Sequence, residues 1–409
     1  MKSSYRYNFA YSCLFMLMLL FSNCNSKKRK DIEQNKDIEQ IKTNDFYVLN
    51  FENELDNINS QIDTITINSI AKNIEIIPLE VTKESLLSDI KFTVAEMDGD
   101  YYVSSGVFNS SSGVIRFDKK GKFKEKLVEK GQGPIELPYL THWSVNDSLN
   151  QISMFGGGRK VITYNIQDGE KKALLLEKDG SYPIFLNDSN YVACANIFPS
   201  TDNKIPYLAF FDKNGKIEHS LYYPENHNVG FEISENNTQG AIYESYGIFK
   251  DDKDNALFKD VFNDTIYRIK SISDISPYIC IYRGKMTPLH KFATDANQQS
   301  TAIYIRRLIE TKQHFFISYL YNKTKQTAIW DKETGKIIAR NVATDQMSRE
   351  YVRYSHVIRY RVPNGKIVLL DVVSSKNNTI YCMLRAEDAA EFIPDVDFDS
   401  NPLIIKIVL

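Results

Sequence analysis

The sequence is short of cysteine, of net charge and of long apolar runs, and each shortage narrows the classes of protein it can encode. Its 50 Lys and Arg residues are matched by 52 Asp and Glu, for a formal net charge of −2 in 409 residues. A nucleic-acid surface needs a clustered basic excess, so this balance argues against a nucleic-acid partner. Helical periodicity is also scarce, and the segment RAEDAAEFI from Arg385 is the best short candidate.

Sequence motifs of common catalytic sites are missing as well. The six histidines lack HExxH or other metal-ligand spacing, and neither a G-x-S-x-G elbow nor an S-x-D-x-G-x-x-W box is present. Glu136, Glu244 and Glu310 could supply carboxylates, but glycoside hydrolysis needs a set separation between two of them that a sequence cannot reveal. The sequence therefore predicts no cofactor and no metal, and favours a protein without catalytic activity.

The five cysteines contain no CxxC pair that would suggest metal or redox chemistry. Two of them lie in the N-terminal segment, and Cys194, Cys280 and Cys382 fall within predicted strands. An odd number favours buried free thiols, and one disulfide plus a spare thiol is the alternative.

The N-terminus reads as a targeting segment. Lys2 and Arg6 precede an apolar run from Phe9 to Phe21, which is shorter than the roughly 20 residues that a membrane-spanning helix needs. The run ends in LLFSNC, which places Cys24 where a bacterial lipoprotein signal has its lipidated cysteine. We interpret residues 1–24 as a lipoprotein signal peptide, with an ordinary secretory signal as the alternative. The predicted partner is then a membrane, held through the lipid anchor.

Residues 25–45 are charged, poor in apolar side chains and internally repetitive, with DIEQ occurring twice, which is typical of a flexible tether. The positions from Lys27 to Lys30 are all basic, which favours the periplasmic side of a bacterial membrane over the cell surface. Residues 46–409 remain for the folded domain.

One β-hairpin phrase recurs along that domain. It appears as GVIRFDKKGKFKEKLV, KVITYNIQDGEKKALLL, YLAFFDKNGKIEHSLYY and QTAIWDKETGKIIARNV, which start at Gly113, Lys160, Tyr207 and Gln326. In the FDKKGK and FDKNGK turns an Asp can accept backbone amides and a Gly can adopt positive φ. The turn residues Asp118, Asn165 and Asp212 lie 47 positions apart, so one supersecondary unit is repeated.

A unit of this length holds about four ordinary strands, and four-stranded blades repeated around an axis form a β-propeller. We predict an all-β, six-bladed propeller. The strands between Ile62 and Leu79 should close the ring against the C-terminal NPLIIKIVL. A sandwich or a β-solenoid of similar hairpins is the alternative.

The order of several short motifs resembles a family of bacterial lipoproteins with a six-bladed, TolB-like propeller. The motifs are IIPLEVTKESLLSDI from Ile76, the VIRFDKKGKF hairpin, the GQGPIE loop, DTIYRI from Asp264 and the terminal NPLIIKIVL. The resemblance covers roughly Ile62 to Leu409. It implies the fold and a location in the cell envelope, and it carries no enzymatic activity.

The GQGPIE loop is interpreted as a structural turn. Gly131 and Gly133 permit positive φ, Pro134 restricts the next turn, and Glu136 can accept backbone amides. A phosphate cradle is the alternative, but it would need a helix to follow, and THWSVND resembles a strand.

Propeller sites usually lie at the axis, so we place the candidate ligand-binding residues on the inner strands. These strands should begin near Tyr139, Ala241, Thr301 and Val352. The predicted axial residues are His142, Trp143, Glu244, Tyr246, Arg306, Arg307, His356 and Arg359. Such a mixture of aromatic and charged groups suits a polyhydroxylated or anionic ligand, although the same charges could instead solvate a water-filled channel or pair with neighbouring blades.

We therefore expect an envelope-anchored binding or scaffolding propeller that holds a glycan, a peptide or an envelope protein on one face or at the axis. The longer connections, Tyr223 to Gln239 and Arg283 to Ser300, are the expected sites of specificity. The alternative is a propeller hydrolase or lyase with axial carboxylates.

Overall fold

The computed structural model describes most of the chain from residue 46 onward. The described residues are 46–57, 65–88, 91–106, 113–178, 181–186, 190–194, 206–222, 247–260, 263–288, 302–322, 324–342, 356–394 and 396–409. They belong to one compact unit, Lys42–Leu409. The predicted signal peptide with Cys24 and the predicted tether lie outside these residues, so both assignments stay predictions.

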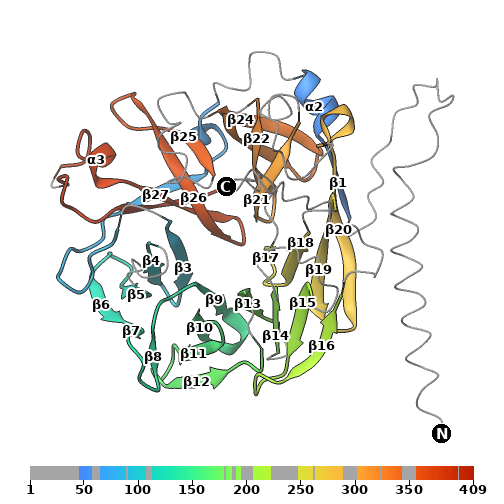
Figure 1. Ribbon diagram of the computed structural model, residues 1–409. Helices are drawn as coiled ribbons and strands as arrows, with labels where there is room; N and C mark the ends of the chain where they lie inside the picture. Colours follow the sequence, from blue (N-terminus) through green and yellow to red (C-terminus); the bar gives the residue numbers. More distant parts are fainter. Residues whose placement is uncertain are drawn as a thin grey trace, which may run out of the picture. The chain divides into compact units, whose positions relative to one another are not determined.

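Six antiparallel sheets are arranged in a ring, so the protein is an all-β, six-bladed propeller, as the repeat predicts (Figure 1). We number the blades I to VI in chain order. Blade I contains β3 (Thr93–Met97), β4 (Asp100–Ser104), β5 (Ile115–Phe117) and β6 (Phe123–Lys126). Blade II contains β9 (His142–Asn146), β10 (Gln151–Gly156), β11 (Lys160–Asn165) and β12 (Lys171–Leu175). Blade III contains β13 (Ser181–Phe185), β14 (Tyr191–Cys194), β15 (Leu208–Phe211) and β16 (Ile217–Leu221).

The second half of the ring follows the same order. Blade IV contains β17 (Gly247–Lys250), β18 (Ala256–Lys259), β19 (Thr265–Ser271) and β20 (Asp274–Tyr282). Blade V contains β21 (Tyr304–Glu310), β22 (His314–Tyr321), β23 (Thr324–Asp331) and β24 (Lys336–Val342). Blade VI contains β25 (Val357–Arg361), β26 (Ile367–Lys376), β27 (Thr379–Leu384) and β28 (Leu403–Val408).

Further elements join or connect these blades. Blades IV and VI each gain a fifth strand, β1 (Tyr47–Asn50) and β2 (Asn73–Ile77), and β7 (Glu129–Lys130) pairs with β8 (Glu136–Leu137). The short helices are α2 (Phe51–Asn57), η3 (Ile67–Ser69), η4 (Asp147–Leu149), η5 (Gly284–Met286) and α3 (Ala386–Ala389). α3 confirms the helix expected after Arg385. Within the described part of the chain, no helix has both the length and the apolar content needed to cross a membrane.

The repeated hairpin forms the two outer strands of a blade, for example β5–β6 in blade I and β15–β16 in blade III. The carboxylate of Asp118 accepts the backbone amides of Lys120 and Lys122 at 2.8 and 2.9 Å, and Asp212 makes the equivalent bonds in blade III. Gly121, which closes the first turn, has a φ of +80°. The predicted turn chemistry is confirmed.

The ring closes where the two ends of the domain meet. β2 pairs antiparallel with the C-terminal β28, with Asn73 opposite Val408 and Ile77 opposite Ile404. This pairing confirms the predicted closure. A sandwich and a solenoid are excluded because neither brings these two segments together in a ring of blades.

The prediction for the inner strand of blade VI was wrong. We expected the strand around SHVIRYRV, which is β25, but β26 is the strand that lies against β3 and β21. Ser374 donates to the carbonyl of Val94, and Ser375 donates to that of Glu310 at 2.6 Å. β25 pairs with only the first half of β26 and packs against β24 and η3. Both segments have strand-like sequences, so the sequence could not distinguish their places.

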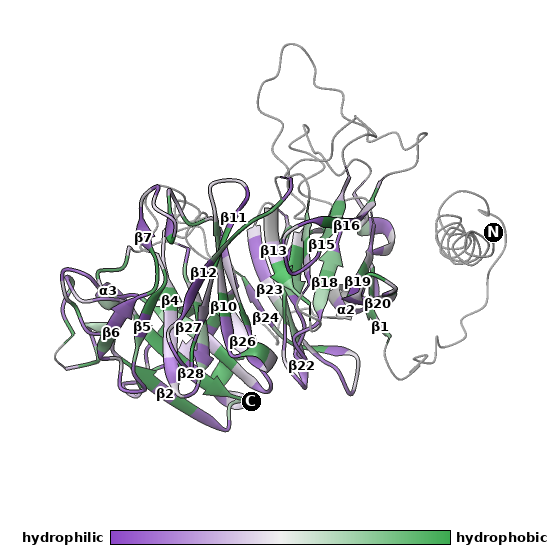
Figure 2. Ribbon diagram, turned by 90° about the horizontal axis from the view of Figure 1, so that it is seen from below, coloured by the Kyte–Doolittle hydropathy of each residue, from purple (hydrophilic) through white to green (hydrophobic). Residues whose placement is uncertain are grey.

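Apolar side chains fill the spaces between neighbouring blades. Ile279 of blade IV packs with Ile317 and Trp330 of blade V, and Phe117 of blade I packs with Met383 of blade VI. All five side chains are at most 2% exposed. Figure 2 shows the corresponding apolar strand interiors and hydrophilic turns. Burial between blades therefore stabilises the ring.

The N-terminal segment from Tyr47 to Asn57, which we call the strap, joins blades IV and V. β1 adds to β20 in parallel, and α2 follows directly. Phe51 is fully buried, with its ring centroid 5.2 Å from that of Tyr319 and 5.3 Å from that of Trp330. The strap therefore seals the outer seam between the two blades.

Candidate functional site

The inner strands run in one direction, so the ring has two distinct faces. β3, β9, β13, β17, β21 and β26 hold the inner positions. We call the side on which these strands begin face A and the side on which they end face B. The end of a four-stranded blade returns to face A, because four antiparallel strands reverse direction three times. Blade VI differs, because its additional strand β25 precedes the inner strand β26 and runs antiparallel to it. The repeated Asp turns and the turn after β17 lie on face B.

On the side toward the axis, the backbone carbonyls of an inner strand have no neighbouring strand to accept hydrogen bonds from. Side chains of other blades donate to some of these carbonyls instead. Arg307 of blade V donates to the carbonyl of Val373 in blade VI at 3.2 Å. Lys250 of blade IV donates to the carbonyl of Val145 in blade II. Because buried backbone acceptors need partners, these charged side chains have a structural role at the axis.

Imidazoles from two blades lie close to these cations. The Nε2 atom of His356 lies 3.2 Å from the carbonyl oxygen of Arg307, and the backbone amide of His356 donates to Asp371 at 2.8 Å. Burial, followed by the positive charges of Arg307 and Lys250, lowers the pKa of His142 to about 4. Burial also lowers the pKa of His356 well below its ordinary value. Both imidazoles are therefore neutral near pH 7.

A basic cluster follows from these contacts, and we define it as Arg306, Arg307 and Lys325. Lys325 lies at the start of β23, toward face A, and burial lowers its pKa to about 8. The charges of Arg306 and Arg307 lower this pKa further, whereas Asp371 opposes them. The cluster therefore carries an excess of positive charge on the face A side.

The structure brings together only part of the predicted axial set. His142, Arg307 and His356 come together, and Arg306 lies beside them. Trp143 instead packs between blades I and II, where its indole donates to Ser104 at 2.7 Å. That these residues bind a ligand stays a prediction.

The remaining predicted residues do not join this group. Arg359 lies on β25, which pairs with the inner strand β26 but is not itself an inner strand, and its backbone amide donates to Asn341 at 3.2 Å. Glu244 and Tyr246 lie outside the described residues. Lys325 was missed because we searched only the inner strands, and β23 is the third strand of its blade.

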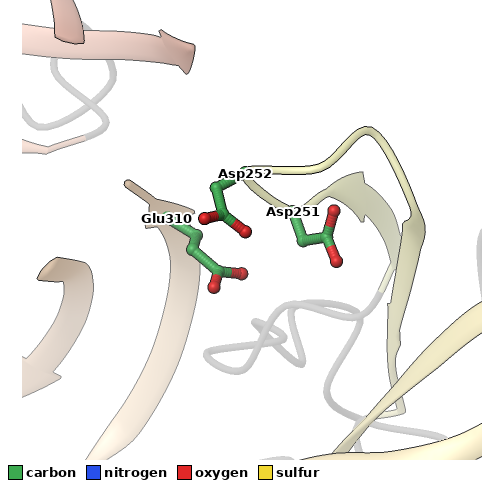
Figure 3. A group of neighbouring side chains, drawn as sticks. All are labelled: Asp251, Asp252 and Glu310. Carbon is green, nitrogen blue, oxygen red and sulfur yellow. The ribbon is translucent and has the colours of Figure 1, made fainter. Parts of the chain in front are cut away.

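Carboxylates gather on face B, at the ends of β17 and β21. One oxygen each from Asp251, Asp252 and Glu310 lies within 4.8 Å of the others. Figure 3 shows the carboxylates of Asp252 and Glu310 facing each other, with that of Asp251 turned aside. The sequence indicates Glu310 as a possible site carboxylate, but it does not predict that Asp251 and Asp252 lie beside it. Asp251 opens the turn after β17, and the same pattern of an Asp at the start of a turn occurs in the repeated hairpin.

Two of the three carboxylates have strong cationic partners. Asp251 pairs with Arg268 at 2.8 Å and also accepts the backbone amides of Lys253 and Asn255. Glu310, which is 1% exposed, forms an ion pair with Lys332. Asp252 is half-buried, and no such pair is found for it among the described residues.

Glu310 also links blades IV and V. Its Oε1 accepts from the hydroxyl of Tyr278 as well as from Lys332, and the guanidinium of Arg268 lies 3.5 Å from the centre of the Tyr278 ring. Burial raises the pKa of Glu310 to about 7, against the lowering effect of Lys332. The charge of Asp252 raises it further.

The GQGPIE loop is a structural turn. Glu136 accepts the backbone amide of Gly133 at 2.8 Å, which is the role expected for this carboxylate. The expected positive φ at Gly131 and Gly133 is not observed. A Cβ at Gly131 or Gly133 would lie 1.9 or 2.9 Å from the Glu136 carboxylate, so a larger residue at either position would displace this carboxylate. The glycines of the loop therefore lie directly against the Glu136 carboxylate, and Pro134 lies in the turn between them and Glu136.

None of the three cysteines within the described residues is in a disulfide. Cys194 and Cys382 are buried, and Cys280 is half-buried. Burial raises the pKa of the Cys194 and Cys382 thiols, so neither is a reactive thiolate near pH 7. The expectation of free rather than disulfide-bonded cysteines is confirmed for these three.

The chain belongs to a family described as a domain of unknown function, DUF4934, whose model matches residues 46–406. No curated protein matches the sequence. Membership of the lipoprotein family that the motifs resemble therefore stays a prediction, and the matched family has no described activity.

Solved structures with similar folds are propellers of low sequence identity. A candidate exported protein from Bacteroides fragilis is 18% identical, with a TM-score of 0.61 over 85% of this chain and 97% of the other. Virginiamycin B lyase from Staphylococcus aureus is 12% identical, with a TM-score of 0.41 over 82% and 100%. BamB from Moraxella catarrhalis is 9% identical, with a TM-score of 0.41 over 82% and 100%. At these identities the likeness concerns the fold alone.

Proposed function

We propose that the chain is an exported envelope protein, lipid-anchored through Cys24 on the periplasmic side, whose propeller binds a carboxylate-bearing ligand on face A without catalysis. The convergence of Arg306, Arg307 and Lys325 beside two neutral imidazoles carries the binding part of this proposal. A cationic region of low solvent access favours an anionic ligand because desolvated charges interact more strongly than hydrated ones.

The anchoring part rests on the N-terminal sequence. LLFSNC places Cys24 at the end of a short apolar run, and a charged tether follows. The candidate exported protein among the fold relatives is compatible with this location. A Cys24→Ser variant should lose its acyl label and leave the membrane fraction. Retention of the label on that variant would refute the assignment of this cysteine.

The axis itself supports a binding role more than a catalytic one. Arg307 and Lys250 cross it to satisfy carbonyls of other blades, so their charges already hold the ring together. Asp251 and Glu310 are also paired with cations.

A propeller hydrolase or lyase remains the alternative, and one observation favours it. The pKa of Glu310 is raised to about 7, which is suitable for a general acid or base. Turnover of an acidic polysaccharide that is abolished by Glu310→Gln in a folded protein would establish this alternative over simple binding.

Binding is best tested with the detergent-solubilised full chain against acidic polysaccharides, acidic peptides and their neutral counterparts. The double substitution Arg306→Gln/Lys325→Gln should weaken binding of the anionic ligand about tenfold or more, because two charges are removed. Lys213→Gln, in an exposed turn on face B, is the matched control and should bind as the unchanged protein does.

Salt provides a second readout of the same interaction. Binding through the basic cluster should weaken as ionic strength rises, and neutral ligands should not compete. Equal binding of neutral and acidic ligands, or an unchanged affinity in the double variant, would contradict the proposed site. The arm that binds, polysaccharide or peptide, identifies the ligand class.

A further inference from the structure

Glu310 is a carboxylate with one unused oxygen in a closed environment. The residue is 1% exposed, and both Tyr278 and Lys332 donate to Oε1. Its Oε2 is buried and has no hydrogen-bond partner among the described residues. A buried polar atom without a partner costs about 1–3 kcal/mol, more when the group is charged, so this oxygen calls for a proton or a cation.

Asp252 lies where it could share such a cation. Its carboxylate faces that of Glu310 across the end of β17 (Figure 3), and one oxygen of each lies within 4.8 Å of the other. Asp252 is half-buried, so part of this residue is in contact with solvent. Asp251 adds a third carboxylate, but its oxygens already accept from Arg268 and from backbone amides.

The local charge is negative even when every cationic partner is included. Asp251 and Arg268 balance each other, and Glu310 and Lys332 do the same. Asp252 then leaves a local charge of about −1, since Lys250 nearby pairs with Asp254 at 3.2 Å. A hard cation with oxygen ligands would offset this charge and satisfy the unused oxygen of Glu310.

We infer that Asp252 and Glu310 form a binding site for a divalent cation of the calcium class on face B, with Asp251 contributing charge rather than a ligand. Water completes the coordination, because calcium takes six to eight oxygens and the protein offers few. A site with so few protein ligands belongs to the weak class, with a Kd of about 10⁻⁴–10⁻³ M, as in extracellular calcium modules. This inference does not depend on a ligand at face A.

Terbium luminescence tests the site directly, because Tb³⁺ replaces calcium and is sensitised by nearby tyrosines. Tyr278 donates to Glu310, so a bound ion would lie within transfer range of its ring. Excitation of tyrosine should give terbium emission that calcium displaces. Lowering the pH should weaken this emission, because protons compete with the metal ion for the carboxylate oxygens.

Asp252→Asn is the decisive variant, since this side chain is half-buried and its loss breaks no ion pair seen among the described residues. It should reduce the calcium-displaceable emission at least fivefold. Asp254→Asn, in the same turn but paired with Lys250, is the matched control and should retain the emission. The face A variant Arg306→Gln/Lys325→Gln should retain it too.

Three results would overturn the inference. The first is terbium emission that calcium does not displace, and the second is an equal loss of emission in Asp252→Asn and Asp254→Asn. Tyr278→Phe should lower the emission without abolishing calcium stabilisation in a thermal melt, which separates loss of the sensitiser from loss of the site. Absence of any calcium effect on the Tm of the unchanged protein at about 10 mM would equally contradict the site.

Discussion

Face A and face B carry opposite charges on the two ends of the same inner strands. β21 shows the contrast within seven residues, because Arg306 and Arg307 lie toward face A and Glu310 ends the strand on face B. The cations near face A lie beside neutral imidazoles, whereas two of the three carboxylates on face B, Asp251 and Glu310, are paired with cations. A ring of similar blades can therefore present two chemically distinct surfaces, and substitutions on one face should leave the other unchanged.

Among the variants that separate the two faces, the largest loss of stability should come from breaking the Glu310–Lys332 ion pair on face B. Glu310→Ala leaves Lys332 buried without its partner and should cost about 3–5 kcal/mol in unfolding free energy at about pH 8. Denaturant unfolding measures this loss. The exposed pair Lys366–Glu391 is the control, and Glu391→Ala should cost about 1 kcal/mol or less. Similar costs for the two variants would show that burial does not govern the Glu310 pair.

A smaller loss is expected from removing the cation at the axis. Arg307→Met leaves the carbonyl of Val373 without this donor and should cost about 1–3 kcal/mol. The same variant should raise the pKa of His142 above about 4, because Arg307 is the charge that lowers it most. An NMR titration of the imidazole measures this shift. An unchanged pKa would show that burial alone sets the value.

The pH dependence of stability should reflect the neutral imidazoles. Because the pKa of His142 is about 4 in the folded protein and about 6.5 in the unfolded chain, the unfolded chain binds more protons between these values. Stability should therefore fall as the pH is lowered from about 6.5 toward 4. His142→Gln should flatten part of this fall in urea titrations, and an unchanged pH profile in this variant would contradict the role of the buried imidazole.

The smallest effects concern the repeated turns of face B, and two glycines form a matched pair. Gly121 and Gly169 both have positive φ, at +80° and +74°, but a Cβ on Gly121 would lie 2.0 Å from the carbonyl oxygen of Pro78, whereas Gly169 has open space. Gly169→Ala should cost about 1 kcal/mol through backbone strain alone, and Gly121→Ala should cost about 1–2 kcal/mol more. Thermal unfolding of both variants measures the difference, and equal Tm values would contradict the contact at Pro78.

The propeller could be predicted from the sequence because its signal is local and repeated. Asp118, Asn165 and Asp212 mark equivalent turns, and each turn depends only on residues next to it. The closure by β2 and β28 followed from the unpaired apolar strand at the C-terminus. In contrast, β25 and β26 have similar strand patterns, so the choice of inner strand depended on packing against blades I and V.

The candidate sites could be predicted only in part, because they depend on which blades face one another. His142 and Arg307 lie near each other on inner strands, but the indole of Trp143 donates to Ser104 in the neighbouring blade and Arg359 lies on β25. Asp252 and Glu310 are 58 positions apart, and no sequence motif joins them. Their proximity is a property of the assembled ring.

The most direct test of the two-faced ring is to measure acidic-ligand binding and calcium-displaceable terbium emission on the same set of variants. The account predicts that Arg306→Gln/Lys325→Gln loses only the acidic ligand and that Asp252→Asn loses only the terbium signal. Loss of both activities in either variant, or of neither activity in both, would contradict it.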